Sequence, residues 1–245
     1  MKKIVFVMGA CMFLSYAFAQ DSAMIKKTKS KKISLNNRPD DHLLIQLSSD
    51  HWAGMTDSIR THQKGFSHGV NIYFMLDRPF KSSPNYSVAF GIGYSTSNIE
   101  FKRVNIDVKS TLPQLPFNAL DSTNHFKRYK LATGYAEVPI EIRYYSDPAH
   151  PNKSWKAALG ARVGVLLNVH TKGAILQDKN GNTINSYVEK ESSKRFISGT
   201  RLMGTARIGY GILSLFGAFQ LNTVLKPDAG PSMNLYQVGI TISGL

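Results

Sequence analysis

The chain has 245 residues, and its 30 lysines and arginines outnumber its 16 acidic residues, giving a formal net charge of +14. Its single cysteine, Cys11, excludes a disulfide within the chain. After residue 20, no run of about eighteen apolar residues predicts a transmembrane helix.

The first 19 residues are typical of a secretory signal peptide. Two lysines precede an uncharged apolar run over residues 4–18, and Ala17 and Ala19 supply the small residues that flank a cleavage site. The run is too short for a spanning helix, so we expect the mature chain to begin near Gln20. The alternatives are a short membrane anchor and lipoprotein processing at Cys11.

Loss of the two leader lysines lowers the net charge from +14 to +12. A basic chain can bind nucleic acid, but an exported chain meets anionic lipid and glycan, so we expect no nucleic-acid partner. Residues 20–41 contain five lysines and predict a basic periplasmic tail. One barrel domain is expected over residues 42–245.

Eight segments alternate apolar and polar residues with a period of two, which predicts β-strands. They lie near residues 42–52, 66–76, 86–95, 136–145, 154–169, 198–210, 213–225 and 234–243. The connections between them alternate between long and short, as in outer-membrane barrels, where long loops lie at one end and short turns at the other. Asp178–Asn182 resembles a tight turn, so the connection 171–197 is expected to extend into a two-stranded flap.

One face of the hairpin 136–169 is apolar, whereas the other is small and charged. In the first strand, Val138, Ile140 and Ile142 alternate with a set that includes two glutamates and an arginine. In the second strand, Leu167 and Val169 belong to the apolar face, and glycines lie between the apolar positions. A soluble sheet buries its apolar face, whereas a transmembrane barrel turns that face to lipid and fills its lumen with small and charged side chains. The sequence therefore predicts an all-β fold, an eight-stranded antiparallel up-and-down transmembrane β-barrel.

Six charged residues fall on the inner face: Glu137, Glu141, Arg143, Arg162, Arg201 and Arg207. Side chains fill the interior of an eight-stranded barrel, and charges buried there need partners. A short turn centred on residues 147–152 would place Arg162 near Pro139, between Glu137 and Glu141. We therefore expect a network that plugs the lumen, in which Glu141 pairs with Arg162 while Glu137 and Arg201 belong to the same network. The excess of arginine favours the alternative, a lumen that conducts a substrate or binds a ligand.

The long connection 96–129 combines basic and aromatic residues, among them Phe101, Lys102, Arg103, Phe126, Lys127 and Arg128. This mixture suits contact with lipopolysaccharide or with a protein partner at the membrane rim. The alternative is a belt at the lipid surface with no specific ligand.

Motifs for catalysis and metal binding do not appear. None of the seven histidines shows H-x-x-x-H spacing, and the chain has no G-x-S-x-G and no glycine-rich phosphate loop. We therefore expect no metal, no cofactor and no enzyme activity. Two alternatives stay open: a barrel-embedded hydrolase or acyltransferase, and a soluble exported barrel that binds a small apolar ligand and turns Phe90 inward and Gly91 outward.

Three segments carry a family resemblance: VPIEIRYY (138–145), GARVGVLLN (160–168) and YQVGITISGL (236–245). They resemble the small outer-membrane β-barrel proteins of Bacteroidota, the PorT-like group. The resemblance implies an eight-stranded outer-membrane barrel, and some relatives are linked to type IX secretion and gliding machinery. From the signal peptide, the strands and the connection lengths we expect a structural or interaction component of the outer membrane.

The last strand also resembles the signal that the barrel-assembly machinery reads. Gln237, Gly239 and Ile242 match its polar, glycine and hydrophobic positions, whereas Leu245 departs from the usual terminal aromatic residue. The resemblance implies that this machinery is a partner during insertion, with outer-membrane lipid as the later surroundings.

Overall fold

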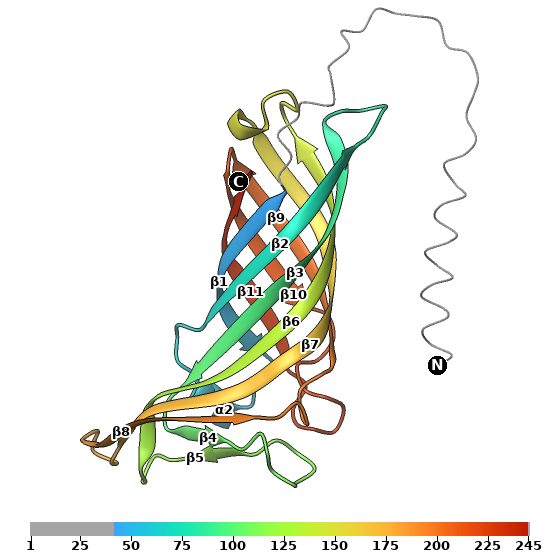
Figure 1. The fold of residues 1–245 in the computed structure, drawn as a ribbon. Coiled ribbons are helices and arrows are strands. Elements are labelled where there is room, and N and C mark those ends of the chain that lie inside the picture. Colours follow the sequence, from blue (N-terminus) through green and yellow to red (C-terminus); the bar gives the residue numbers. More distant parts are fainter. Residues whose placement is uncertain (1–41, 245) are drawn as a thin grey trace, which may run out of the picture. The chain divides into compact units, whose positions relative to one another are not determined.

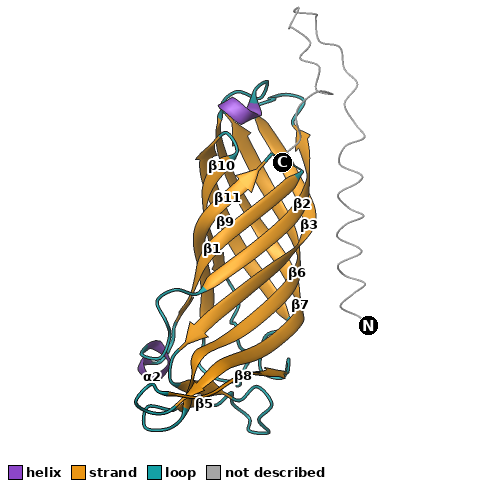
Figure 2. Ribbon diagram, turned by 60° about the vertical axis from the view of Figure 1, so that its left-hand side comes forward, coloured by secondary structure: helices purple, strands orange, loops and turns teal. Residues whose placement is uncertain are grey.

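The computed structural model describes residues 42–244, which form a closed antiparallel barrel (Figures 1 and 2). The predicted signal peptide over 1–19, the predicted tail over 20–41 and Leu245 lie outside the described residues. In the described part of the chain, no helix is both long and apolar enough to cross a membrane.

Eight long strands make the wall. They are β1 (Leu43–Ala53), β2 (His68–Pro79), β3 (Tyr86–Phe101), β6 (His125–Tyr145), β7 (Trp155–Gln177), β9 (Thr200–Tyr210), β10 (Leu213–Gln220) and β11 (Asn234–Ser243). Each pairs antiparallel with the next, and the ring closes because β1 also pairs with β11. The predicted eight-stranded, all-β architecture is confirmed.

The two ends of the barrel differ, as the connection lengths predicted. Short connections over residues 80–85, 146–154 and 211–212 lie at one end, called here the turn end, which also holds the short helix η2 (Pro151–Lys153). The long connections lie at the other end, called the loop end. Figure 1 shows the C-terminal end of β11 at the turn end, where Leu44 of β1 pairs with Ser243.

The loop end has secondary structure of its own: α2 (Asp57–Arg60), the hairpin of β4 (Val104–Ile106) with β5 (Phe117–Ala119), and β8 (Thr183–Ser192). Strand β8 pairs with the outer part of β7, so the predicted flap is confirmed. Its turn uses Gly181 at φ 91°, a backbone angle that favours glycine. Figure 1 shows β8 and the ends of β6 and β7 leaning away from the barrel.

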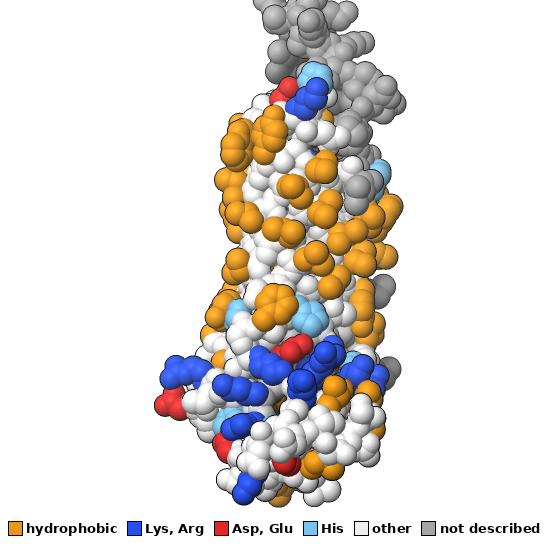
Figure 3. Space-filling model, turned by 90° about the vertical axis from the view of Figure 1, so that its left-hand side faces the viewer, with side chains coloured by type: hydrophobic (Ala, Val, Ile, Leu, Met, Phe, Trp, Pro, Cys, Tyr) orange, Lys and Arg blue, Asp and Glu red, His pale blue; other side chains and the backbone are white. Residues whose placement is uncertain are grey.

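The outer wall is apolar over the half of the barrel nearer the turn end (Figure 3). Ile92 is 67% exposed and Phe90 is 44% exposed, so both side chains point outward. This contradicts the alternative of a soluble barrel, which required Phe90 to point inward. At the turn-end edge of the band, aromatic side chains pair: Tyr86 with Tyr144, whose ring centroids lie 5.1 Å apart, and Trp155 with Tyr210, 5.7 Å apart.

The predicted strand boundaries are wrong towards the loop end. Strand β3 continues from the predicted 95 to Phe101, and β6 begins at His125 rather than near 136. In these extensions the apolar residues, such as Ile99 and Leu131, point inward, while charged residues such as Lys130 point outward. Towards the loop end, apolar residues thus face inward and charged residues face outward, which is the reverse of the apolar band. One alternating sequence pattern therefore cannot be extended through the whole strand.

In β3 and β6 the odd-numbered residues face inward in both parts of the strand, so only the kinds of residue change. In β7 a bulge also moves the later side chains to the opposite face. Tyr135 of β6 is opposite Leu166 and Gly134 is opposite Asn168, so Leu167 has no partner on β6. Sequence alternation had placed Val169 on the outer face with Leu167, but Val169 is buried. The expectation is wrong because an extra residue in one strand moves every later side chain to the opposite face.

Candidate functional site

Side chains fill the lumen in two layers. The layer nearer the turn end is polar and charged, and the six residues predicted to form a charge network all lie in it, each no more than 7% exposed. The layer nearer the loop end is a hydrophobic core. We describe the charged layer first because it holds most of the predicted site.

Glu137 on β6 is the centre of one ionic cluster. Arg201 on β9 donates to its Oε1 from Nη2 at 2.6 Å and from Nε at 2.9 Å. The two residues lie on either side of β7, where both face Gly164. A Cβ at Gly164 would lie only 3.0 Å from the Cγ of Glu137, so the glycine leaves the space in which the ion pair forms. The Arg201 cation also lies 4.1 Å from the centroid of the Tyr135 ring.

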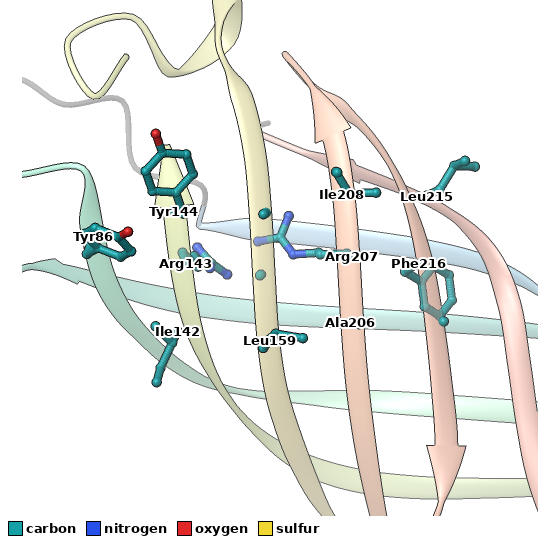
Figure 4. Close-up of a pocket in the computed structure, with 13 residues that line it drawn as sticks. Tyr86, Ile142, Arg143, Tyr144, Leu159, Ala206, Arg207, Ile208, Leu215 and Phe216 are labelled. Atoms are coloured by element: carbon teal, nitrogen blue, oxygen red, sulfur yellow. The ribbon is translucent and has the colours of Figure 1, made fainter. Parts of the chain in front are cut away.

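Glu141, four residues along β6, is the centre of a second cluster. Its Oε2 accepts from Arg143 Nε at 3.0 Å and from Arg207 Nη2 at 3.1 Å. Figure 4 shows these two arginines pointing toward one another. Gly160 lies opposite Glu141, and a Cβ there would be 2.8 Å from the glutamate Cγ. Each glutamate thus faces a glycine of β7, and in each case an arginine from β9 reaches across β7 to the glutamate.

The predicted pair between Glu141 and Arg162 is wrong, although the register behind it is right. Arg162 lies opposite Pro139, between the two glutamates. Its guanidinium group instead crosses the lumen and donates to Tyr73 Oη at 2.9 Å and to Gln46 Oε1 at 2.8 Å. The Tyr73 hydroxyl donates in turn to Glu137. In a barrel this narrow, a long side chain reaches the opposite wall, so neighbours in one hairpin need not pair.

Three charged lumen residues were missing from the predicted network. Lys156 is buried, and its Nζ lies 5.5 Å from the centroid of the Tyr145 ring. The Oδ1 of Asp77 lies 3.8 Å from Nη1 of Arg143. Asp50 is fully buried and accepts from Ser48 and from the amide of Gln237, whose Nε2 lies 3.1 Å from both carboxylate oxygens. For Asp50 and Lys156, which lie in predicted strands, alternation was the available signal. Asp77 follows the predicted strand 66–76 and became part of the wall only because β2 extends to Pro79.

Gln237 and Gly239 lie in the seam between the first and last strands, where β1 pairs with β11. Gln237 faces the lumen and binds Asp50 across the seam, while Gly239 is opposite Ser48 with no space for a side chain. Ile242 lies opposite Ile45. These positions give the residues a structural role. That the barrel-assembly machinery reads them stays a prediction.

The loop-end layer is apolar because the long connections fold over the barrel mouth. Trp52, Met203 and Leu131 from the wall pack with buried side chains of the loops, including Ile106 and Phe196. The backbone ties the loops together as well, since Leu115 N donates to Ala229 O at 2.8 Å. The barrel is therefore closed at this end by a folded hydrophobic cap.

The basic and aromatic residues predicted at the rim do not act as one surface. Phe101 is completely buried in the cap core, which corrects its predicted place at the rim. Phe126 is half-buried and packs edge-on against Tyr187 of β8, with ring centroids 5.7 Å apart. Four members are exposed: Lys102, Arg103, Lys127 and Arg128.

An apolar recess of about 490 Å³ lies in the outer wall near the turn end (Figure 4). Small residues, including Ala157, Ala206 and Gly217, leave space between larger apolar neighbours such as Leu159. Within residues 42–244, no group of three His, Cys, Asp or Glu side chains is placed to hold a metal ion.

Comparisons with solved structures give outer-membrane barrels at low sequence identity. The neisserial surface protein A is 12% identical, with a TM-score of 0.34, over 82% of this chain and 96% of that chain. The outer membrane protein Ail of Yersinia pestis, solved in a phospholipid bilayer nanodisc, is 12% identical, with a TM-score of 0.31, over 83% of this chain and 99% of its own.

No curated protein is significantly similar to the chain in sequence. The family model described as "Outer membrane protein beta-barrel domain" matches residues 41–224, which is most of the chain and all but the last strand of the barrel. The chain therefore belongs to the outer membrane protein beta-barrel domain family.

Proposed function

We propose that the protein is a non-conducting barrel of the bacterial outer membrane that serves as a structural or interaction component of the cell envelope. The filled lumen is the observation that carries this proposal. A pore needs a continuous aqueous path, but here the buried ion pairs of one layer and the hydrophobic core of the other occupy the interior. The apolar outer band and its paired aromatic residues support insertion into lipid.

The loop end is the part that can meet a partner. In outer-membrane barrels the long loops face the cell exterior, and here they form a folded cap from which β8 projects. All but one residue of β8 are exposed, including Tyr187 and Val188. A fixed, projecting sheet suits recognition of another envelope component, and catalysis is not part of the proposal.

The resemblance to PorT-like proteins makes the secretion and gliding machinery the first candidate partner. The proposal also includes lipopolysaccharide around the barrel and transient contact with the barrel-assembly machinery during insertion. A photo-crosslinking residue at Val188 is expected to capture an envelope protein in intact cells. The matched control is a crosslinker at Leu215, which is also exposed but lies in the apolar band. Equal capture at both positions contradicts a partner site at the loop end.

Conductance tests the closed lumen. The mature protein, reconstituted in planar bilayers, is expected to show heat-modifiable migration on gels and no stable conductance steps. A large open porin at the same protein-to-lipid ratio is the positive control. Regular steps from this protein would overturn the closed lumen, and absence of the heat shift would overturn the membrane barrel itself. Hydrolysis assays on lipid and peptide substrates check the expectation that it is not an enzyme.

A further inference from the structure

Four strands place charged side chains in one row on the outside of the barrel at the loop end. Glu100 of β3 is opposite Lys130 of β6, which is opposite Lys172 of β7, which is opposite Lys190 of β8. The residues beside two of these lysines, Leu131 and Thr171, are buried, so the lysines point away from the barrel. The row thus has three cations and one carboxylate.

A pocket of about 330 Å³ is lined by three members of this row: Glu100, Lys130 and Lys172. Arg128 joins Lys130 and Lys172 in its lining, whereas Glu100 is the only acidic residue among the lining residues. Glu100 is itself shared with another cation, since Lys64 Nζ lies 4.0 Å from its carboxylate. Ala174 and Val188 add apolar surface to the pocket. The pocket is therefore cationic and partly apolar.

The cations of this row lack a full set of anionic partners. Lys130 donates to the neutral Oδ1 of Asn98 at 2.8 Å. Burial lowers the pKa of Lys130, and the charge of the adjacent Lys172 lowers it further. The three lysines are held together on three paired strands, so their like charges repel each other, and a bound anion would relieve this repulsion.

The row lies on the loop-end side of the part of the wall that is suited to lipid. Lys172 comes five residues after Leu167, an exposed apolar residue of β7, a distance of roughly 16 Å along the strand at about 3.3 Å per residue. Figure 3 shows lysine and arginine side chains gathered directly beyond the hydrophobic band. Long lysine side chains can reach back towards a membrane surface from such a position.

We propose that Lys130, Lys172, Lys190 and Arg128 bind the phosphate groups of an anionic lipid of the outer leaflet whose acyl chains lie against the apolar band. The inference rests on the proposed function, in which the barrel spans the outer membrane with its loop end outside. Clustered ammonium groups and a forked guanidinium are the donors that phosphate oxygens accept best. The adjoining apolar wall favours a lipid over a soluble anion.

The test compares two triple variants with the same change in charge. Lys130→Gln, Lys172→Gln and Lys190→Gln together remove the row, while Lys179→Gln, Lys194→Gln and Lys226→Gln remove three other lysines that are exposed at the loop end. Binding of purified bisphosphorylated lipid A to the mature protein in uncharged detergent is measured for both. At about fivefold per lysine, the first triple is expected to bind on the order of 100-fold more weakly. The control triple is expected to stay within about threefold of the wild type.

Three results would overturn the proposal. Equal weakening in both triples means a diffuse charge effect. Equal wild-type affinity for lipid A and for its phosphate-free form means that phosphate is not recognised. Equal binding of inorganic pyrophosphate means that the site serves a soluble anion. Heat-modifiable migration is recorded first for each variant, so failure of the proposed membrane barrel is distinguished from failure of the lipid site.

Discussion

The turn-end and loop-end halves of the barrel are built on opposite patterns. In the turn-end half, apolar side chains such as Ile140 point outward and charged ones such as Glu141 point inward. In the loop-end half, Lys172 points outward while Val169 points inward, as in a soluble sheet. Strands β3, β6 and β7 run through both halves. One strand therefore meets two different surroundings, and the side-chain pattern changes with them.

The two interiors are also held together by different forces. The charged layer depends on partners, because a buried ion without a counter-charge is costly even where the pair itself adds little net stability. The apolar cap depends on close packing and on removing hydrocarbon from water. Substitutions in the two halves should therefore lower the free energy of unfolding for different reasons, and unfolding experiments can measure the difference.

The largest effect is expected when a glutamate of the charged layer loses its charge. Glu137→Gln and Glu141→Gln each leave buried guanidinium groups under-compensated and should lower the free energy of unfolding by about 3–5 kcal/mol. Urea unfolding of the barrel in lipid vesicles measures this. Lys102→Gln, at an exposed position, should change it by less than about 0.5 kcal/mol. Midpoints equal to the wild type for both glutamate variants would favour an open, hydrated lumen.

Leu131→Ala tests the apolar half. Leu131 is 1% exposed in the cap core, so the variant should leave a cavity and lose about 2–5 kcal/mol. The control is Leu159→Ala on the outer wall, where the side chain is 69% exposed and the expected loss is below about 1 kcal/mol. The same unfolding assay ranks the two variants. A reversed ranking means that the cap is not a packed core.

A smaller effect is expected from adding one methyl group between β6 and β9. Gly164→Ala places a Cβ 3.0 Å from Glu137 Cγ and should cost about 1–3 kcal/mol by pushing the glutamate away from Arg201. Gly204→Ala is the matched control, since its added Cβ meets no atom within 4 Å. If both variants are equally stable, the gap at Gly164 is not what admits the arginine.

The smallest effect belongs to the turn end, outside both layers. A hydrogen bond from His150, followed by one from the Ala149 backbone N–H, lowers the pKa of Asp147 below its usual 3.8. The folded-state pKa is depressed, so this stabilisation is present above the unfolded pKa and disappears as the pH falls through the folded one. Asp147→Asn should remove that small dependence below about pH 4. If the Asp147→Asn variant keeps the whole pH dependence of stability, that dependence belongs to other carboxyl groups.

The sequence by itself determined the membrane half of the molecule. Period-two alternation revealed eight strands and the outward faces, because side chains of a strand point alternately to its two sides. Connection lengths distinguished the two ends, and the proline-containing turn placed Arg162 opposite Pro139. All of these are local properties of consecutive residues.

Only the tertiary structure decided which distant groups meet. Arg201 reaches Glu137 across a glycine, and Arg162 leaves its own hairpin for Tyr73 because a narrow barrel brings opposite walls within reach of one side chain. The row from Glu100 to Lys190 exists because four strands align, and a single bulged residue in β7 turns Lys172 outward. Sequence alternation carries no register between distant strands and continues unchanged through a bulge, so neither the pairing nor the row could be deduced without the fold.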